Sequence, residues 1–244
     1  MKILFKQKQW IVMQAIFVVI GILSGIIAKT QVKGSVGGLA VGLSFINKTD
    51  EYTFPILLIL LSDLAFNVEY VQGTFLTYLL CGQSRKSWML RKSVTFYLFV
   101  LLQYVIAFVV ISLAAGIVAG HFGLAASQLP SAALYGAIAR EMGLKVLTTL
   151  VFVSFGVLIT TLLPGKLVVG SIASIGAVFI GMRGSALLYH ALPDSGVLGR
   201  IFDIVWMQDP DKVWTWIFGF AVFALFALVS TGQVKRIEIA NRGA

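Results

Sequence analysis

The composition of this 244-residue chain is that of a membrane protein. Hydrophobic residues make up 59% of it and charged residues 12%, which is more apolar surface than one soluble core can cover, and long uncharged stretches recur along the sequence. The formal net charge is +9, but the charges are dispersed between apolar stretches, which argues against a nucleic-acid-binding face. Cys81 is the single cysteine, so an intramolecular disulfide and a cysteine metal cluster are excluded.

Six segments approach the length of about 20 apolar residues that a membrane-spanning helix needs. The second and fifth are short, so they either extend beyond their apparent limits or border irregular segments. We expect an all-α polytopic membrane fold with a single transmembrane domain, residues 1–244. The predicted spans are residues 10–28, 53–68, 93–119, 141–163, 167–182 and 213–233.

The placement of lysine and arginine indicates the orientation of these spans. On one side, the basic residues cluster against the spans and are opposed only by Glu69 and Glu238, whereas the other side holds nearly as many acidic as basic residues. We therefore expect a multi-pass protein of the cell membrane with both termini cytoplasmic. The expected cytoplasmic charges are Lys2, Lys6, Lys8, Arg85, Lys86, Arg91, Lys92, Lys166, Lys235, Arg236 and Arg242.

Two of the predicted loops are informative. Pro164, Gly165 and Lys166 predict a tight cytoplasmic turn, because proline ends a helix and glycine permits the reversal. The outer segment 183–212 is much longer and holds apolar stretches that are too short to span a membrane. We expect a pair of short outer re-entrant helices there, with an ordinary exposed loop as the alternative.

An amphipathic segment, residues 69–92, lies between the second and third spans. One apolar stripe at helical spacing predicts a helix that lies on the inner membrane surface rather than across the membrane. Gly82 can end this helix, Ser84 can cap the next one, and Trp88 is expected to be an anchor at the membrane surface. A positive-inside loop with one aromatic residue is the simpler interpretation. The stripe consists of Phe75, Leu76, Leu79 and Leu80.

The same segment carries a motif. Its residues are Glu69, Tyr70, Gly73, Thr74, Leu79, Leu80, Gly82, Ser84, Arg85, Trp88 and Lys92. This pattern resembles the cytoplasmic segment between the second and third helices of ABC-2 type permeases, the six-helix membrane subunits of ATP-driven exporters. The order of spans and loops is similar over the whole chain.

The resemblance implies which residues couple the chain to an ATPase. In that family the segment includes a coupling helix that docks into a cleft of a nucleotide-binding subunit. The implied partners are cytoplasmic nucleotide-binding ATPase subunits, a second permease subunit, identical or homologous, and membrane lipid. The implied coupling residues are Glu69, Gly73, Thr74, Leu76, Leu79, Leu80, Gly82 and Arg85.

The chain has no Gly-x-x-x-x-Gly-Lys-Ser/Thr loop, so we do not expect it to be an enzyme, and ATP and Mg²⁺ are expected on the partner subunit. His121 and His190 lack a second ligand at metal spacing, and neither a metal nor another cofactor is expected on this chain. Gly21 and Gly25 are spaced for close packing between helices.

Polar residues of the second span form the other candidate site. Asp63 lies in an apolar stretch, where an ionisable group is costly unless it faces protein, water or an opposite charge. Asp63, Asn67 and Tyr70 are spaced at i, i+4 and i+7 and share one helix face. This face either borders a translocation path or the partner permease, or it forms an ordinary interhelical hydrogen bond with Gln103 or Gln14.

The expected function is export of a hydrophobic or amphipathic compound, such as an antimicrobial peptide, a drug or a lipid, driven by ATP hydrolysed on the partner subunit. Two alternatives remain open. One is a secondary carrier or channel that uses Asp63, with the inner helix as a passive anchor. The other is a membrane assembly subunit with no transport of its own.

Overall fold

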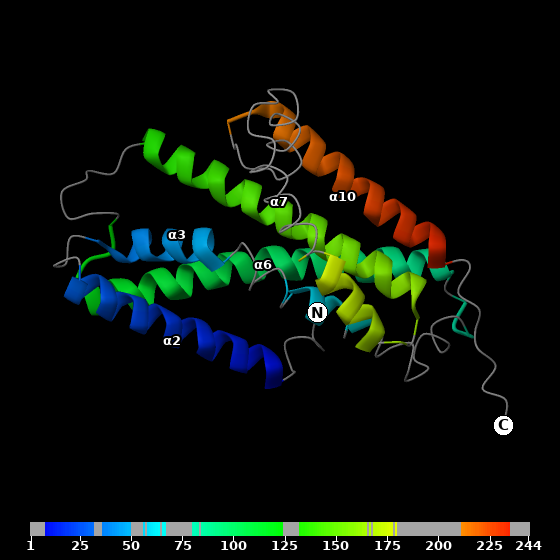
Figure 1. Ribbon diagram of the computed structural model, residues 1–244, viewed down its shortest axis with the longest axis horizontal. Coiled ribbons are helices and arrows are strands. Elements are labelled where there is room, and N and C mark those ends of the chain that lie inside the picture. Colours follow the sequence, from blue (N-terminus) through cyan, green and yellow to red (C-terminus); the bar gives the residue numbers. More distant parts are fainter. Residues whose placement is uncertain are drawn as a thin grey trace. The chain divides into compact units, whose positions relative to one another are not determined.

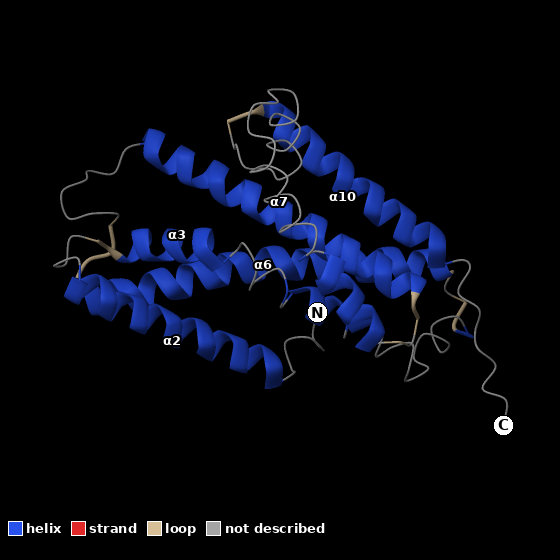
Figure 2. Cartoon of the chain, viewed as in Figure 1, coloured by secondary structure: helices blue, strands red, loops and turns tan. Residues whose placement is uncertain are grey.

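The computed structural model describes residues 8–31, 36–49, 56, 58–63, 65–66, 80–82, 84–123, 132–164, 166, 168–177, 179 and 211–234. Apart from an isolated bridge residue, Val36, the elements in these ranges are helices (Figure 2). The labelled helices in Figure 1 are α2 (Lys8–Gln31), α3 (Gly38–Thr49), α6 (Arg85–Ala119), α7 (Ala132–Leu162) and α10 (Val213–Gln233). The expected all-α class is confirmed for the described residues.

Within the described ranges, three helices are long and apolar enough to cross a membrane: α6, the part of α7 from Tyr135 onward, and α10. The bounds of α10 match the predicted sixth span, whereas α6 and α7 have 35 and 31 residues. α6 begins eight residues before the predicted third span, and α7 begins nine residues before the predicted fourth span. The predicted spans include only apolar stretches, whereas both helices also include polar turns at their starts. α2 covers the predicted first span.

The predicted second and fifth spans fall on shorter described helices. Residues 58–63 and 65–66 are helical, and we refer to them as the Asp63 helix. Val168–Ala177 is a short apolar helix. The predicted re-entrant helices of the outer segment lie outside the described residues, except for Asp211 and Lys212 at its end.

The chain divides into two compact units that share the two longest helices. The first unit contains residues 1–51 and 98–143, and the second contains residues 52–97 and 144–244. The divisions fall between residues 97 and 98 of α6 and between residues 143 and 144 of α7. Each of these helices therefore contributes to both units.

In the first unit, glycines let α2 approach α6. A Cβ atom added to Gly21 would lie 2.8 Å from the Cβ of Ala114, and one added to Gly25 would lie 2.9 Å from the Cα atom of Ala115. Such distances leave no room for a side chain, as in other membrane helix pairs that meet through small residues. The contacts advance in the same order along both helices, so α2 and α6 are parallel (Figure 1).

α3, which is shorter than a membrane span and was not among the predicted helices, also packs on α6 through glycine. A Cβ atom on Gly42 would overlap the hydroxyl of Ser112, and one on Gly38 would lie 2.7 Å from the Cα atom of Gly116. Because the later residue of α3 meets the earlier part of α6, the two helices are antiparallel. Lys48, which was expected in an outer loop, lies on this helix.

The turn after α6 satisfies the N-terminus of α3. The N–H groups of Gly38 and Leu39 donate to the carbonyls of His121 and Phe122, both at 3.0 Å. These are two of the N–H groups that a helix N-terminus leaves without an intrahelical partner. The chain reaches this position because Gly120 has a φ of +89°, a conformation that suits glycine at the end of a helix.

In the second unit, the Asp63 helix packs on α7. A Cβ atom on Gly156 would lie 3.3 Å from Cγ2 of Ile59 and 3.2 Å from Oγ of Ser62, and Asp63 contacts Thr160 one turn later. Contacts that advance together along both helices show that the Asp63 helix and α7 are parallel.

α10 covers another face of α7. Its partly buried residues pack against a core of Leu144, Leu147 and Val151, and the Phe155 and Phe226 ring centroids lie 5.5 Å apart. The two helices run in the same direction (Figure 1). The packing residues of α10 are Trp216, Val222, Phe223 and Phe226.

The predicted turn at residues 164–166 is confirmed. α7 ends at Leu162, and the N–H of Lys166 donates to the carbonyl of Leu163 at 3.2 Å. Helical hydrogen bonding resumes at once, since the N–H of Gly170 donates to the carbonyl of Lys166 at 2.8 Å. Proline directly after the last helical turn accounts for the stop.

The α2–α6 contact gives a stability prediction. Gly25→Ala adds a methyl group within 3.0 Å of α6 backbone atoms, so we expect a net loss of about 1–2 kcal/mol despite the better helix propensity of alanine. Gly136→Ala in α7 is the matched control, because nothing lies within 4 Å of its added Cβ. Apparent melting temperatures in detergent, followed by tryptophan fluorescence, compare the two. Equal melting temperatures would contradict the close contact.

Candidate functional site

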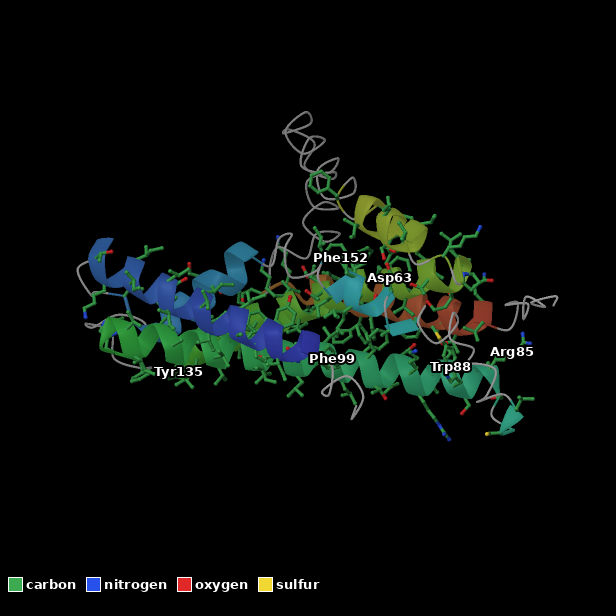
Figure 3. All side chains as sticks on the ribbon, turned by 90° about the horizontal axis from the view of Figure 1, so that it is seen from below. Asp63, Arg85, Trp88, Phe99, Tyr135 and Phe152 are labelled. Atoms are coloured by element: carbon green, nitrogen blue, oxygen red, sulfur yellow. The ribbon has the colours of Figure 1, made fainter. Side chains whose placement is uncertain are left out.

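Asp63 is fully buried within the second unit. Its Oδ1 accepts a hydrogen bond from the hydroxyl of Thr160 on α7, and Ser171 on helix Val168–Ala177 is a further neighbour of the carboxyl. Among the described residues, no hydrogen bond reaches Oδ2. Three helices, predicted as the second, fourth and fifth spans, therefore meet at one carboxyl group (Figure 3).

The hydrogen-bond partner of Asp63 is Thr160, not Gln14 or Gln103 as predicted from the sequence. The amide of Gln14 donates from Nε2 to Oε1 of Gln103 at 2.8 Å, and both glutamines belong to the first unit. The predicted kind of contact, a hydrogen bond between helices, is present, but Thr160 makes it. An apolar run with scattered hydroxyls does not indicate which threonine faces the carboxyl.

Among the described residues, the Thr160 hydroxyl is not a donor to this carboxyl alone. The Thr160 hydroxyl also lies 3.0 Å from the carbonyl oxygen of Gly156, and a single O–H donor is shared between the two acceptors. A buried polar group that lacks a partner costs about 1–3 kcal/mol. Ionisable groups inside membrane segments are usually retained for function, so Asp63 remains a candidate site residue. Asn67 and Tyr70 lie outside the described residues.

A second contact involves Ala65, two residues after Asp63 on the Asp63 helix. The ammonium of Lys92 donates to the carbonyl oxygen of Ala65. It also lies 4.9 Å from the ring centroid of Phe66 and 5.2 Å from that of Trp88. The two rings meet edge to face, with centroids 6.4 Å apart. We call these four residues the Lys92 clamp.

The components of the Lys92 clamp are individually strong. A cation over an aromatic face contributes about 0.5–1 kcal/mol when exposed and about 2 kcal/mol when desolvated, and a hydrogen bond from a charged donor contributes about 1.5–3 kcal/mol. Lys92 is partly buried, whereas its neighbour Arg91 is exposed. Lys92 therefore does more than provide one of the positive charges that orient the chain.

Trp88, predicted to be an anchor at the membrane surface, turns its side chain toward protein. Its side chain is only 4% exposed, because it packs against Phe66 and the Lys92 ammonium. Figure 3 shows it on the first turns of α6, near Arg85. Its aromatic neighbour, Phe66, comes from a helix about 20 residues earlier in the sequence, whereas Lys92 lies one turn later on α6 itself. The local pattern of charged and aromatic residues does not show the contact with Phe66.

The structure describes three of the eight predicted coupling residues. Leu80 is helical and 79% exposed, the chain turns at Gly82 with a φ of +80°, and α6 begins at Arg85. The N–H of Ser87 donates to Oγ of Ser84 at 3.2 Å, which confirms the predicted cap. The other five, Glu69, Gly73, Thr74, Leu76 and Leu79, lie outside the described residues.

In comparisons with known proteins, no family model and no curated sequence matches this chain. Within the described ranges, no group of three or more histidine, cysteine, aspartate or glutamate side chains could hold a metal ion. The candidate site is therefore defined by its own contacts: a buried carboxyl at Asp63 and, on the same helix, the Lys92 clamp.

The Asp63 contact can be tested through its partner. Thr160→Val removes the hydroxyl that reaches Oδ1 and should lower the free energy of unfolding by about 1–3 kcal/mol. Thr161→Val is the matched control, since the Thr161 hydroxyl donates to the carbonyl oxygen of Leu158 in the same helix. In the Asp63→Asn background, the effect of Thr160→Val should shrink, which a double-mutant cycle measures by thermal unfolding. Additive effects would show that the two side chains do not interact.

Proposed function

We propose that this chain is the permease subunit of an ATP-driven exporter of the ABC-2 type. The observation that carries the proposal is the junction from Leu80 through the Gly82 turn and the Ser84 cap into α6. At this junction an exposed apolar side chain lies five residues before a 35-residue helix. A partner that docks on the segment 69–83 would therefore act directly on a helix that contributes to both units.

The directions of the helices support six spans with both termini on the same side of the membrane, which the charge pattern assigns to the cytoplasm. Three pairs are parallel: α2 with α6, the Asp63 helix with α7, and α7 with α10. In the proposed order these are spans one and three, two and four, and four and six. Two parallel helices that are separated by one span in the sequence require the span between them to cross the membrane in the opposite direction. Six spans of alternating direction meet this requirement for all three pairs.

The proposed mechanism assigns energy conversion to the partner. Two cytoplasmic ATPase subunits hold ATP and Mg²⁺, and their closure moves the docked segment and opens a path between this permease and a second one. A docked helix supplies the differential contacts in two states that such a change requires. The apolar and amphipathic class of cargo, an antimicrobial peptide, drug or lipid, suits a chain of which 59% is hydrophobic.

A charge at the docking surface should separate the ATPase from the permease. We expect Leu80→Asp to insert normally but to lose the co-purifying, vanadate-sensitive ATPase activity, because burying an unpaired charge at an apolar interface weakens association by more than about tenfold. Leu80→Met, which stays apolar, is the matched control. In the wild-type complex, bound ATPase should also protect the exposed Cys81 from maleimide. Full ATPase activity in purified Leu80→Asp would remove the mechanical basis of the proposal.

A secondary carrier that uses Asp63 is the second candidate, favoured by the full burial of that carboxyl, to whose Oδ2 no described residue donates. Asp63→Asn keeps most of the hydrogen bonding but removes the charge. If ATP drives transport, this variant should retain its vanadate-sensitive ATPase activity, and proteoliposomes with a trapped pH dye should show no proton movement beyond that of empty liposomes. Proton movement that wild type supports and Asp63→Asn abolishes would favour the carrier. An assembly subunit would show neither activity.

A further inference from the structure

We propose that the Lys92 clamp transmits movement of the inner segment to the buried Asp63 contact, which makes Lys92 a positioning residue for energy coupling. This inference rests on the proposed function. It adds a specific route within the second unit, from the start of α6 through the Asp63 helix to α7, and it assigns a role to a residue outside the predicted coupling set.

The geometry of Lys92 points to this role. Four basic residues lie in the first turns of α6, and an orienting charge needs only to stay at the inner surface. Arg91 and Lys86 are exposed, as that requirement predicts. Lys92 instead turns to the Ala65 carbonyl and to the rings of Phe66 and Trp88. Its charge is used to join two helices.

The Lys92 clamp joins the two helices that lie directly before and after residues 67–84 in the sequence. Ala65 and Phe66 precede residues 67–84, and Trp88 and Lys92 follow them. A second aromatic contact, between Phe66 and Phe96 with ring centroids 6.2 Å apart, extends the junction by about one turn of α6. Movement of the start of α6 is therefore carried to the Asp63 helix by side-chain contacts, not by the intervening chain alone.

The Asp63 helix continues the route. Asp63 lies two residues before Ala65 on this helix and binds Thr160 of α7, while Ile59 and Ser62 pack at Gly156. A single helix thus holds the clamp at one end and the α7 contact at the other. All of these residues belong to the second unit. Spatial continuity alone does not establish coupling. The test must therefore measure a response beyond the Asp63 contact, at the end of the route that lies away from the start of α6.

Two cysteine reporters separate the near side from the far side. The native Cys81 is exposed and belongs to the docking segment 69–83, so it reports from the near side. Ser174→Cys, placed in a Cys81→Ser background, reports from helix Val168–Ala177, where Ser174 is fully buried and bonds the carbonyl of Gly170 of its own helix. The measurement is the rate of N-ethylmaleimide labelling of each reporter in membranes that hold the full complex, with and without ATP and vanadate.

We expect ATP and vanadate to change the labelling of both reporters in the otherwise wild-type complex. In Lys92→Met, the Cys81 response should persist, while the Ser174→Cys response should fall by about tenfold, equivalent to 1.4 kcal/mol of coupling. Arg91→Met removes the same charge from the adjacent exposed position and should leave both responses unchanged.

The outcomes distinguish the two proposals. If ATP changes neither reporter in the wild-type complex, the exporter proposal fails. If Cys81 responds and the Ser174→Cys response is as large in Lys92→Met as in Arg91→Met, the exporter proposal stands and the Lys92 route is overturned. Should Lys92→Met fail to insert, Phe66→Leu removes one ring of the clamp while keeping the lysine charge, and the same comparison with Arg91→Met decides.

Discussion

The absence of water in the hydrocarbon layer is the constraint on which the rest of the structure depends. Every polar group within the spans needs a partner supplied by the protein. Most hydroxyls find one within their own helix by bonding a carbonyl three or four residues earlier, as Thr148, Ser154 and Ser230 do. Asp63, Lys92 and the Gln14–Gln103 pair have groups that a single helix does not satisfy, and their bonds therefore join different helices.

Close backbone approach is the other means by which these helices associate. Lipid is as apolar as a leucine side chain, so burial of apolar surface contributes little to the association of helices in a membrane. The first unit relies on glycine contacts, with Gly21 and Gly25 on α2 and Gly38 and Gly42 on α3 all against α6. The second unit relies more on aromatic rings and polar contacts. The two units thus use different kinds of interaction, and α6 passes through both.

Features with a local cause could be predicted from the sequence. The turn at Pro164, the cap at Ser84 and the bounds of α10 follow from proline, from a serine at a helix start and from an uninterrupted apolar run. Features that depend on distant residues could not. α3 is short, rich in glycine and ends in polar residues, so it resembles a loop until its contacts with α6 are known.

The candidate site shows the same division. The unusual position of Asp63 is evident from one charged residue in an apolar stretch, but its partner on α7 is about 100 residues away. Trp88 and Lys92 have the local pattern of a membrane-surface pair, and only the presence of Phe66 explains why both side chains turn inward. Charge patterns report the side of the membrane, whereas packing decides the direction of each side chain.

The length of α6 has a mechanical consequence. At a rise of 1.5 Å per residue, its two ends lie about 50 Å apart. A tilt of about 5° around its N-terminal end would displace its C-terminal end by about 4 Å, close to the diameter of a methyl group. Because the N-terminus of α3 is bonded to the carbonyls that follow α6, that displacement would draw α3 with it. A small rotation at one end of α6 would thus become a larger translation at the other end.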